Sequence, residues 1–471
     1  MKQHYHKMGR RRFSALLFCL LLLLSFSFTA LAADWPQTEL NAGTAAVVDA
    51  DTGAVLFSKN EDQAAYPASI TKVMTALVVL ENCKLDEEVT FSHDAVYNVD
   101  KGSSNAQIEA GDVLTVEDCL YALLLKSANE SANALAEHVA GSREAFAELM
   151  NQKAAELGCT NTHFTNPSGL FDANHYTTAR DMTKIGIAAM NNEEFLKIES
   201  STSHRLAPGQ RVPEGNVIYM EHKMLLPNSR YYDSRVIAGK TGYTLDAGNT
   251  LITMAEQDGR RLVAVVMQDK NPAHYTDTKL LLDLGFNETE NQTVGEGIVD
   301  LSALCERLIA DTIVPEGTKS SELLLPSAEQ IVSLPTGASQ EGLSYELEYN
   351  LPQDAPKQAV AKIIYSMDGR TVGSSYVEKE PSIQVMLDEV PTQTKVAVAV
   401  TVSGFTVAAI VAFVIFGGGA ALGAKSIHDD RKLRRKMKEK RRARLQELEM
   451  SEEEFRELVE KKKAELSRKR K

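Results

Sequence analysis

Short runs of β-branched and other apolar residues occur in two groups along the chain, and both groups predict strands. Turn-forming residues separate neighbouring runs, at Asp51-Thr-Gly53 in the first group and at Asp258-Gly259 in the second. The first group therefore predicts a hairpin of a central sheet. The predicted strands cover residues 45–50, 54–59, 236–244, 250–254 and 261–267.

Between the two groups, apolar residues recur at the spacing of helices. One apolar run without glycine or proline begins at or near Ser69, and a short helix over residues 280–285 closes this part of the chain. Strands at both ends that enclose helices predict an α+β arrangement for residues 34–290. The other helical patterns cover residues 114–125, 131–139, 142–157 and 177–190.

The pattern changes after residue 290. One helical pattern covers residues 299–313, and short strand-like segments then alternate with proline and glycine. Such segments predict a small β-rich domain over residues 291–391. This region carries no recognisable chemistry.

The first 33 residues predict a secretory signal peptide. They hold five lysines and arginines and no acidic residue, and an apolar run over residues 13–28 leads to a small-residue cleavage site at Ala30-Leu-Ala32. A basic start, an apolar centre and a small-residue end are typical of a secretory signal peptide, which residues 1–33 therefore predict. An uncleaved membrane anchor is the alternative.

Residues 396–424 predict one transmembrane helix, because these 29 positions contain no charged residue. The following residues 431–444 hold ten lysines and arginines against Glu439 alone. By the positive-inside rule, this excess places residues 425–471 in the cytoplasm as a basic tail. We therefore expect a single-pass protein of the cell membrane. A buried core helix is the alternative, which the triple glycine at 417–419 and the basic flank disfavour.

Charge and cysteine use narrow the classes of function. The net charge of −13 over 471 residues averages two basic ends and an acidic middle, and an acidic exterior does not suggest a nucleic-acid partner. The cysteines after residue 33 are spaced neither as a disulfide framework nor as a metal-binding pattern. We therefore expect buried free thiols, no metal and no cofactor. These cysteines are Cys83, Cys119, Cys159 and Cys305.

Ser69 and Lys72 are the first candidates for chemistry. They stand three residues apart at the start of the predicted helix, and residues at that spacing share one helix face. The hydroxyl and the amine can therefore meet as a nucleophile and its base, while free N–H groups at the helix start can bind an oxyanion. The alternative is that Ser69 only caps the helix. A lysine in the first turn, however, opposes the helix dipole, which lowers its pKa and suits a base.

Two further motifs follow in order. Ser127-Ala-Asn129 lies in a predicted connection between helices, and Lys240-Thr-Gly242 lies in a predicted strand. Ser-x-x-Lys, Ser-Asp-Asn and Lys-Thr-Gly together are the signature of β-lactamases and penicillin-binding proteins, and here alanine replaces the aspartate. Residues 40–290 thus resemble the low-molecular-weight penicillin-binding proteins that act as serine D-alanyl-D-alanine carboxypeptidases. The resemblance implies an antiparallel sheet covered by helices, an extracytoplasmic active site beside a helical region, and a β-rich stalk.

The resemblance also implies chemical roles. Ser69 attacks the carbonyl between two D-alanines of a peptidoglycan stem peptide, and Lys72 takes the hydroxyl proton. Ser127 relays a proton to the leaving D-alanine, while Asn129 holds the substrate amide and Lys72. Water then hydrolyses the acyl-enzyme. Penicillin would acylate the same serine.

The strand motif is expected to bind the substrate. By resemblance, Lys240 and Thr241 bind the terminal carboxylate, although strand alternation puts Lys240 and Gly242 on one face and Thr241 on the other. Gly242 leaves the strand open to backbone approach. The N–H of Tyr243 stabilises the oxyanion together with that of the nucleophile. Where similar enzymes often carry an arginine this chain has His222, which predicts weaker or pH-dependent binding of the carboxylate.

Three other functions remain open. A class A β-lactamase shares the motifs but needs a glutamate that positions water, and no glutamate stands in a matching context at residues 166–170. A D,D-endopeptidase cleaves a similar bond. A non-catalytic, penicillin-recognising membrane sensor suits the predicted span and basic tail but has no use for an activated nucleophile. The expected partners are peptidoglycan stem peptides, β-lactam antibiotics and the membrane.

Overall fold

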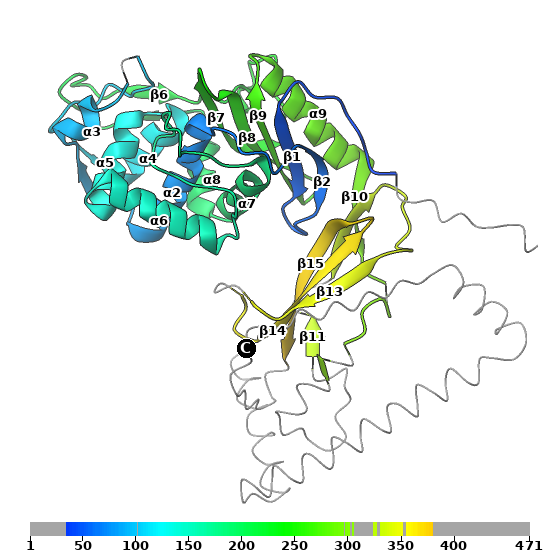
Figure 1. Ribbon diagram of the computed structural model, residues 1–471. Helices are drawn as coiled ribbons and strands as arrows, with labels where there is room; N and C mark the ends of the chain where they lie inside the picture. The colour runs from blue at the N-terminus through cyan, green and yellow to red at the C-terminus, as the bar shows by residue number, and fades with distance from the viewer. Residues whose placement is uncertain are drawn as a thin grey trace, which may run out of the picture. The chain divides into compact units, whose positions relative to one another are not determined.

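The computed structural model describes most of the chain between residues 34 and 379. The predicted signal peptide (1–33), transmembrane helix (396–424) and tail (425–471) lie outside the described residues, which are coloured in Figure 1. In the part that is described, no helix has both the length and the apolar composition needed to cross a membrane. The described ranges are 34–100, 102–295, 297–301, 304–305, 324–326, 330–351 and 355–379.

A five-stranded antiparallel sheet forms the centre of the fold, in the order β2-β1-β9-β8-β7. All five predicted strands are present, with bounds that differ by a few residues. β1 pairs with β9, which lies more than 200 residues later in the chain. In the resulting order β7 is an edge strand. The strands are β1 (Thr44–Asp49), β2 (Val55–Lys59), β7 (Val236–Thr244), β8 (Gly248–Gln257) and β9 (Arg260–Asp269).

The predicted helices are also present, and three of the six begin at a side-chain cap. Thr115, Ser142 and Thr178 each accept a hydrogen bond from the backbone N–H three residues later, which satisfies a donor that the first turn leaves free. The helices are α2 (Thr71–Asn82), α4 (Val116–Leu125), α5 (Asn129–Ala140), α6 (Arg143–Glu156), α7 (Ala179–Met190) and α9 (Ala273–Glu288).

Several elements escaped the sequence patterns because they are short. They are the helices α3 (His93–Tyr97) and α8 (Glu193–Glu199), the 3-10 turns η1 (Ala68–Ile70) and η2 (Lys223–Leu225), and the strand pairs β3 (Glu88–Thr90) with β4 (Val113–Thr115) and β5 (Ser203–Arg205) with β6 (Val217–Tyr219). In addition, α9 is longer than the expected helix over residues 280–285, because it begins seven residues earlier, directly after Pro272.

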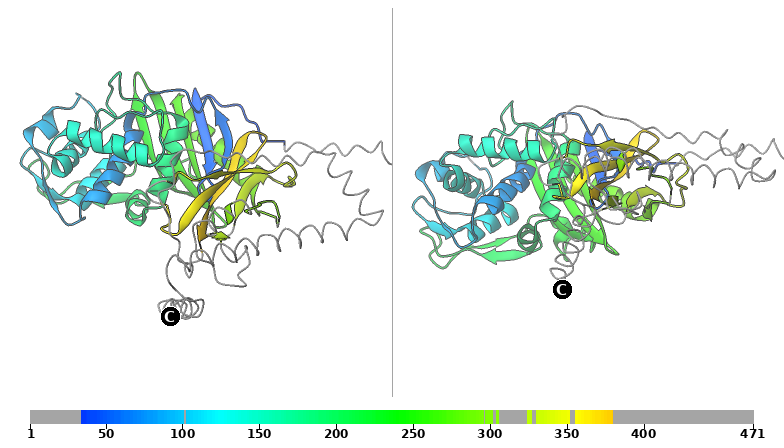
Figure 2. Two further views of the ribbon diagram at one scale, coloured as in Figure 1. Left: turned by 60° about the horizontal axis from the view of Figure 1, so that its bottom comes forward. Right: turned by 90° about the horizontal axis from the view of Figure 1, so that it is seen from below.

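The sheet is buried on both faces, and Figures 1 and 2 show helices on either side of it. Met254 and Val263 face the larger cluster, which includes α2, α4, α5 and α7. Leu251 and Leu262 face the smaller cluster beneath α9. This alternation along β8 and β9 is the expected consequence of successive strand residues pointing to opposite faces.

Strands continue after the central sheet. β10 pairs with β12, and a further antiparallel sheet has the order β11-β15-β14-β13. Only part of the predicted helix over residues 299–313 lies within the described residues. The strands are β10 (Thr289–Thr293), β11 (Leu324–Pro326), β12 (Ile331–Pro335), β13 (Ser344–Glu348), β14 (Ala359–Met367) and β15 (Arg370–Lys379).

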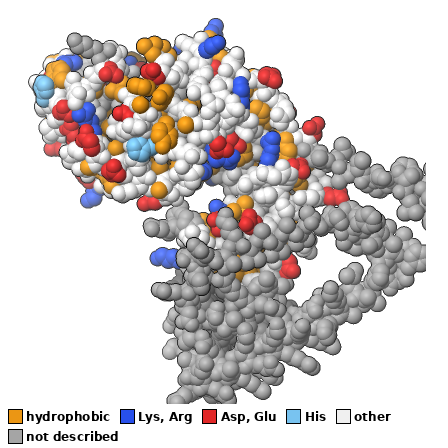
Figure 3. Space-filling model, in the orientation of Figure 1, with side chains coloured by type: hydrophobic (Ala, Val, Ile, Leu, Met, Phe, Trp, Pro, Cys, Tyr) orange, Lys and Arg blue, Asp and Glu red, His pale blue; other side chains and the backbone are white. Residues whose placement is uncertain are grey.

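On the face shown in Figure 3, acidic and basic side chains are interspersed over the described residues. Cys83, Cys119 and Cys159 are free thiols, as expected. Cys119, Cys159 and Cys305 are buried, whereas Cys83 is half-buried.

Candidate active site

Ser69 lies in the 3-10 turn η1, and Lys72 lies one turn later in α2. The lysine Nζ is 3.1 Å from the serine Oγ, so the predicted meeting of hydroxyl and amine is present in the structure. Neither η1 nor α2 is capped by a side chain. Ser69 therefore does not act as a helix cap, which removes the purely structural explanation for this serine.

Lys72 is fully buried and surrounded by acceptors that carry no charge. Its Nζ lies 2.7 Å from Oδ1 of Asn129 and 2.6 Å from the carbonyl oxygen of Ser168. Burial and the charge of Lys240 hold the pKa of Lys72 well below its ordinary value, against the weaker opposing effect of Glu130. The neutral amine is thereby favoured, which is the form that a general base requires.

The loop that holds the Ser168 carbonyl was not predicted as part of the site. Asn166 accepts hydrogen bonds from the N–H groups of Ser168 and Gly169, and the hydroxyl of Thr75 donates to the carbonyl of Pro167. These bonds fix the loop against α2. The Asn-Pro-Ser-Gly cluster indicated a turn here, but no pattern in the sequence indicated which carbonyl would meet the lysine.

The backbone is strained at two points of the helical wall of the cleft. Ala68, directly before the nucleophile, has φ +51°, and Ser127 has φ +59°. Residues other than glycine adopt such angles at a cost, and they concentrate at functional sites. Gly169 also has a positive φ, and a Cβ there would lie 1.9 Å from the carbonyl oxygen of Ala68. Only glycine fits at that position.

Strand β7 forms the opposite wall of the cleft. It is the edge strand of the sheet, so one row of its backbone N–H and C=O groups is not used for sheet pairing. A Cβ at Gly242 would lie 2.8 Å from the backbone nitrogen of Ser69. The expected close approach at Gly242 therefore brings the strand against the turn that carries the nucleophile.

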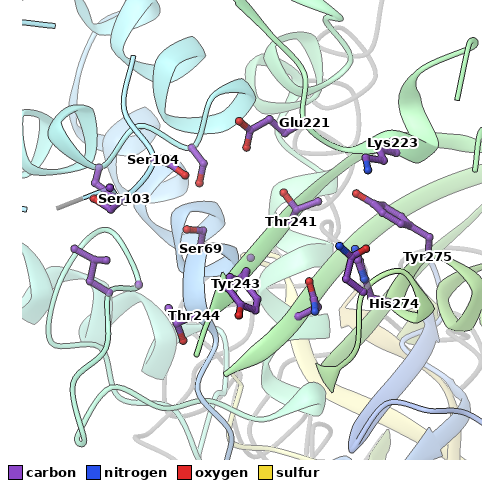
Figure 4. A pocket seen from close by; sticks show the side chains of 18 residues that line it. Ser69, Ser103, Ser104, Glu221, Lys223, Thr241, Tyr243, Thr244, His274 and Tyr275 are labelled. Carbon is purple, nitrogen blue, oxygen red and sulfur yellow. The ribbon is translucent and has the colours of Figure 1, made fainter. Parts of the chain in front are cut away.

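The Lys-Thr-Gly motif is divided between two environments, because Lys240 is buried whereas Thr241 and Gly242 line the pocket. Thr241 and Tyr243 line the pocket, as Figure 4 shows. Lys240 is buried and is not among the residues that line it. Burial lowers the pKa of Lys240, while the charges of Glu199 and Glu221 oppose that effect. The lysine therefore acts from beneath the pocket wall.

Glu199 is a further residue that the sequence did not indicate. It is the last residue of α8 and is fully buried. Burial raises the pKa of its carboxyl to about 7, although the charge of Lys240 favours the carboxylate. An acid buried so deeply without a role would be costly, so we interpret Glu199 as the counter-charge of Lys240.

The pocket itself is a cavity of about 370 Å³ between the helical region and β7. Ser69 points into it in Figure 4, with Ser103 and Ser104 on one side and Tyr275 on the other. Among the described residues that line the pocket, Glu221 is the only acidic one, and it pairs with Lys126 at 2.8 Å. The cavity is therefore polar rather than strongly acidic.

Ser127 and Asn129 both line this pocket, which confirms that they face the cleft. Ser127 lies in the connection after α4, and Asn129 is the first residue of α5. Glu130, the next residue, accepts a hydrogen bond from the backbone N–H of Ala106 at 2.6 Å. This bond positions the loop that carries Ser103 and Ser104.

The predicted role of His222 as a protonated ligand of the carboxylate does not fit the structure. Its ring is buried, is not among the pocket-lining residues, and has Thr253 and the N–H of Met224 as partners. Burial, together with the nearby charge of Lys240, lowers its pKa to about 3. His222 is therefore neutral at working pH. The neighbouring Lys223 lines the pocket instead.

The arrangement joins a hydroxyl, a neutralised amine and an unpaired strand edge around one cavity. These are the parts of a serine acyl-transfer site whose general base is a lysine. Among the described residues that line the pocket, Glu221 has the only carboxylate, and it forms an ion pair with Lys126. No other carboxylate there could hold a water molecule against an acyl group on Ser69.

Comparisons with known proteins agree with this class. A family model described as D-alanyl-D-alanine carboxypeptidase, Peptidase_S11, matches residues 30–271. The D-alanyl-D-alanine carboxypeptidase DacF of Bacillus subtilis is 34% identical over 297 residues, which cover 59% of this chain and 73% of that protein. A D-alanyl-D-alanine endopeptidase of Pseudomonas aeruginosa is 32% identical over 271 residues, covering 55% of this chain and 84% of that protein.

The fold agrees as well. The structure of penicillin binding protein 5 from Haemophilus influenzae superposes with a TM-score of 0.55 at 27% identity, covering 73% of this chain and 98% of that one. The chain therefore belongs to the S11 family of D-alanyl-D-alanine carboxypeptidases. The expected family and its α+β fold are confirmed.

Proposed function

We propose that this protein removes the terminal D-alanine from peptidoglycan stem pentapeptides through an acyl-enzyme on Ser69, and so takes part in building and remodelling the cell wall. The observation that carries the proposal is the buried Lys72 amine, which lies 3.1 Å from the Ser69 hydroxyl among uncharged acceptors. A lysine held in this way can take the hydroxyl proton as the serine attacks.

The chemical steps follow from the two walls of the pocket. The Ser69 oxygen attacks the carbonyl carbon between the two D-alanines, and the N–H groups of Ser69 and Tyr243 stabilise the resulting oxyanion. In a comparable serine hydrolase, removal of one such donor raises the barrier by about 3–4 kcal/mol. Ser127 passes a proton to the departing amine of D-alanine. Water then attacks the ester and restores Ser69.

Recognition of the terminal carboxylate is assigned to the strand wall. Thr241 offers its hydroxyl in the pocket, while Lys240 supplies positive charge from beneath the same strand. Asn129 holds the amide of the penultimate residue and keeps Lys72 in place. Lys223, which also lines the pocket, adds a second cation on this side.

A D,D-endopeptidase is the second candidate function. The relative in Pseudomonas aeruginosa carries that name at 32% identity over most of its length, and the bond that such an enzyme cleaves has the same D-alanyl carbonyl. A β-lactamase is disfavoured because the one acidic residue among the described pocket-lining residues, Glu221, is paired with Lys126. A pure penicillin sensor is disfavoured by the intact nucleophile and base.

We also propose the placement of the enzyme in the cell. Residues 1–33 direct export and are removed, residues 291–391 form a β-rich stalk, and residues 396–424 anchor the chain in the membrane with residues 425–471 in the cytoplasm. The strands β10 to β15 support the stalk. The charge pattern of the sequence supports the orientation. A protease-protection assay on intact cells, with an epitope at the C-terminus, tests it.

The activity is tested on the full-length protein in mild detergent. Incubation with a peptide ending in D-Ala-D-Ala should release free D-alanine, and Ser69→Ala should release none. A cross-linked muropeptide in a parallel reaction separates the two candidates, because release of cross-linked halves without free D-alanine would favour the endopeptidase. Fluorescent penicillin should label Ser69 and remain bound, whereas rapid turnover of the drug would favour a lactamase.

A further inference from the structure

Three side chains outside the active site meet where helices α2 and α5 end. Cys83 directly follows α2, Glu87 directly precedes β3, and His138 lies in the last turn of α5. Their thiol, carboxylate and imidazole donor atoms all lie within 4.8 Å of one another. No sequence pattern indicated this cluster, because 51 residues separate Glu87 from His138.

The spacing of the donors suits a small tetrahedral ion. Around Zn²⁺, with bonds of about 2.0–2.3 Å, neighbouring ligand atoms are separated by about 3.3–3.6 Å. Nε2 of His138 and an oxygen of Glu87 are already 3.1 Å apart. The Cys83 sulfur lies within 4.8 Å of both of these atoms, so all three donors are near enough to share one ion.

The surroundings also favour a cation. The second carboxylate oxygen of Glu87 accepts the backbone N–H of Lys84 at 2.8 Å, a type of contact that orients ligands in metal sites. Two helix C-termini meet at the cluster, and the free carbonyls and dipole of a helix C-terminus attract positive charge. His138 and Glu87 are partly exposed, which leaves a path for the ion and a place for water.

We propose that Cys83, Glu87 and His138 bind a Zn²⁺ ion, with water as the fourth ligand. A thiolate, an imidazole and a carboxylate are the donor types that zinc takes in proteins. On binding, the Cys83 thiol loses its proton to solvent and the sulfur forms the bond to the metal. The competing explanation for the cluster is an ion pair between His138 and Glu87 alone. That explanation does not account for the position of the Cys83 thiol beside them.

The position of the site indicates what the ion does. The opposite ends of the same two helices reach the active site, where α2 carries Lys72 and α5 carries Asn129 in its first turn. Zinc joins the far ends of the two helices and stabilises the helical wall of the cleft. It takes no part in the reaction, so acylation at low temperature is unchanged by its removal.

The test uses full-length protein that has been reduced and stripped of metal with a chelator. Titration with Co²⁺ alone should show one ion per chain and a thiolate-to-cobalt absorption band, which added Zn²⁺ should abolish. Cys83→Ser should remove the band, and His138→Gln should weaken binding at least about tenfold, because even outer contacts of metal sites contribute that much. Cys159→Ala, which alters a free thiol elsewhere in the helical region, should bind Co²⁺ as the wild type does.

A second measurement, the unfolding temperature, keeps the proposal testable if Cys83→Ser does not fold. Zn²⁺ should raise the unfolding temperature of the wild type and of Cys159→Ala, but not that of His138→Gln, whose substitution lies at the surface. No thiolate band when Co²⁺ equals the protein concentration would overturn the proposal. A band that persists in Cys83→Ser, or an equal zinc-induced shift in His138→Gln, would overturn it as well.

Discussion

Two lysines are buried on opposite walls of the same cleft, and their surroundings differ. Lys72, on the helical wall, is held by the Asn129 side chain and the Ser168 carbonyl. Lys240, on the strand wall, has the buried Glu199 as an opposing charge. Burial lowers the pKa of both amines, but the next largest effect differs. The charge of Lys240 lowers the pKa of Lys72 further, whereas the charge of Glu199 raises the pKa of Lys240.

The difference shows how one residue type serves two functions. Neutral acceptors hold an amine in place without favouring its protonated form as strongly as a carboxylate would, so Lys72 is suited to accept a proton. A buried carboxylate favours the cation, so Lys240 is suited to attract the substrate carboxylate. The repulsion between the two lysines adds to the contrast, because the charge of Lys240 further lowers the pKa of Lys72.

The largest effect is expected when the base is kept charged. Lys72→Arg retains a cation near Ser69 but cannot lose its proton at working pH. We expect acylation by penicillin and release of D-alanine to fall by about 10⁶-fold, the loss found when the nucleophile or base of a comparable serine hydrolase is removed. Ser69→Ala is the matched control. Acylation of the arginine variant at more than a small fraction of the wild-type rate would show that another group takes the proton.

The pH dependence of the wild type sharpens the same point. Since the base must be neutral and the pKa of Lys72 is lowered, acylation should rise with pH and reach its plateau well below the ordinary pKa of lysine. The rate of labelling by penicillin measured across pH gives this limb directly. A rise that is complete only near the ordinary pKa of lysine would contradict the assignment.

A smaller loss is expected on the strand wall. Lys240→Met removes the cation and should lower kcat/KM for a free-acid peptide. The decrease should correspond to a loss of about 2–5 kcal/mol in transition-state stabilisation, the usual cost of breaking a buried charge pair. The control is the same peptide with a terminal amide, which has no carboxylate to bind. Equal losses for the acid and the amide would show that Lys240 does not recognise the carboxylate.

The sequence predicted the helical wall, with Ser69 and Lys72, better than the surroundings of Lys240 on the strand wall, for a physical reason. Residues three apart in a helix must share a face, so the meeting of Ser69 and Lys72 follows from local geometry alone. The partners of Lys240 depend on tertiary packing. Glu199 lies 41 residues before it in a short helix that no pattern indicated, and the loop carbonyl of Ser168 is contributed by the backbone, whose position no side-chain motif encodes.

The central strands were predictable for the same local reason, and the neighbours of His222 were not. The five sheet strands have runs of β-branched residues bounded by turn clusters. The burial of His222 depends instead on the packing of η2 beneath Gly239 and Thr253, where a Cβ on Gly239 would lie 2.8 Å from the imidazole. A local alignment of motifs cannot reveal such burial.

Glu199→Gln tests the counter-charge directly. Without the carboxylate the charged form of Lys240 loses support, so the pKa of Lys240 should fall further. The alkaline limb of kcat/KM for the free-acid peptide should therefore move to lower pH by about one unit or more, since the charges of a buried lysine and a buried glutamate typically shift each other's pKa by about that much. An amide-terminated peptide should not show the shift. An unchanged alkaline limb in the acid peptide would separate Glu199 from Lys240.

The smallest effect concerns His222, which lies beside Lys240 but is neutral. His222→Gln should leave the KM of the acid peptide unchanged and should lower the unfolding free energy by about 1–3 kcal/mol at pH 8, through the lost contact with Thr253. The folded-state pKa of about 3 lies below the unfolded value of 6.5. As pH falls below 6.5 the unfolded chain therefore binds a proton that the folded chain refuses, and the wild type loses stability by about 1.4 kcal/mol per pH unit from this group.

The glutamine variant cannot bind that proton, so the stability difference between the two proteins should shrink between pH 6.5 and 5. Urea unfolding at both pH values measures it. His222→Arg provides the opposite case, because a permanent cation would be buried beside Lys240 without an acid of its own. We expect it to destabilise the fold more than glutamine does and to leave carboxylate binding no tighter. A lower KM for the acid peptide but not for the amide in His222→Arg would show that position 222 does reach the substrate carboxylate.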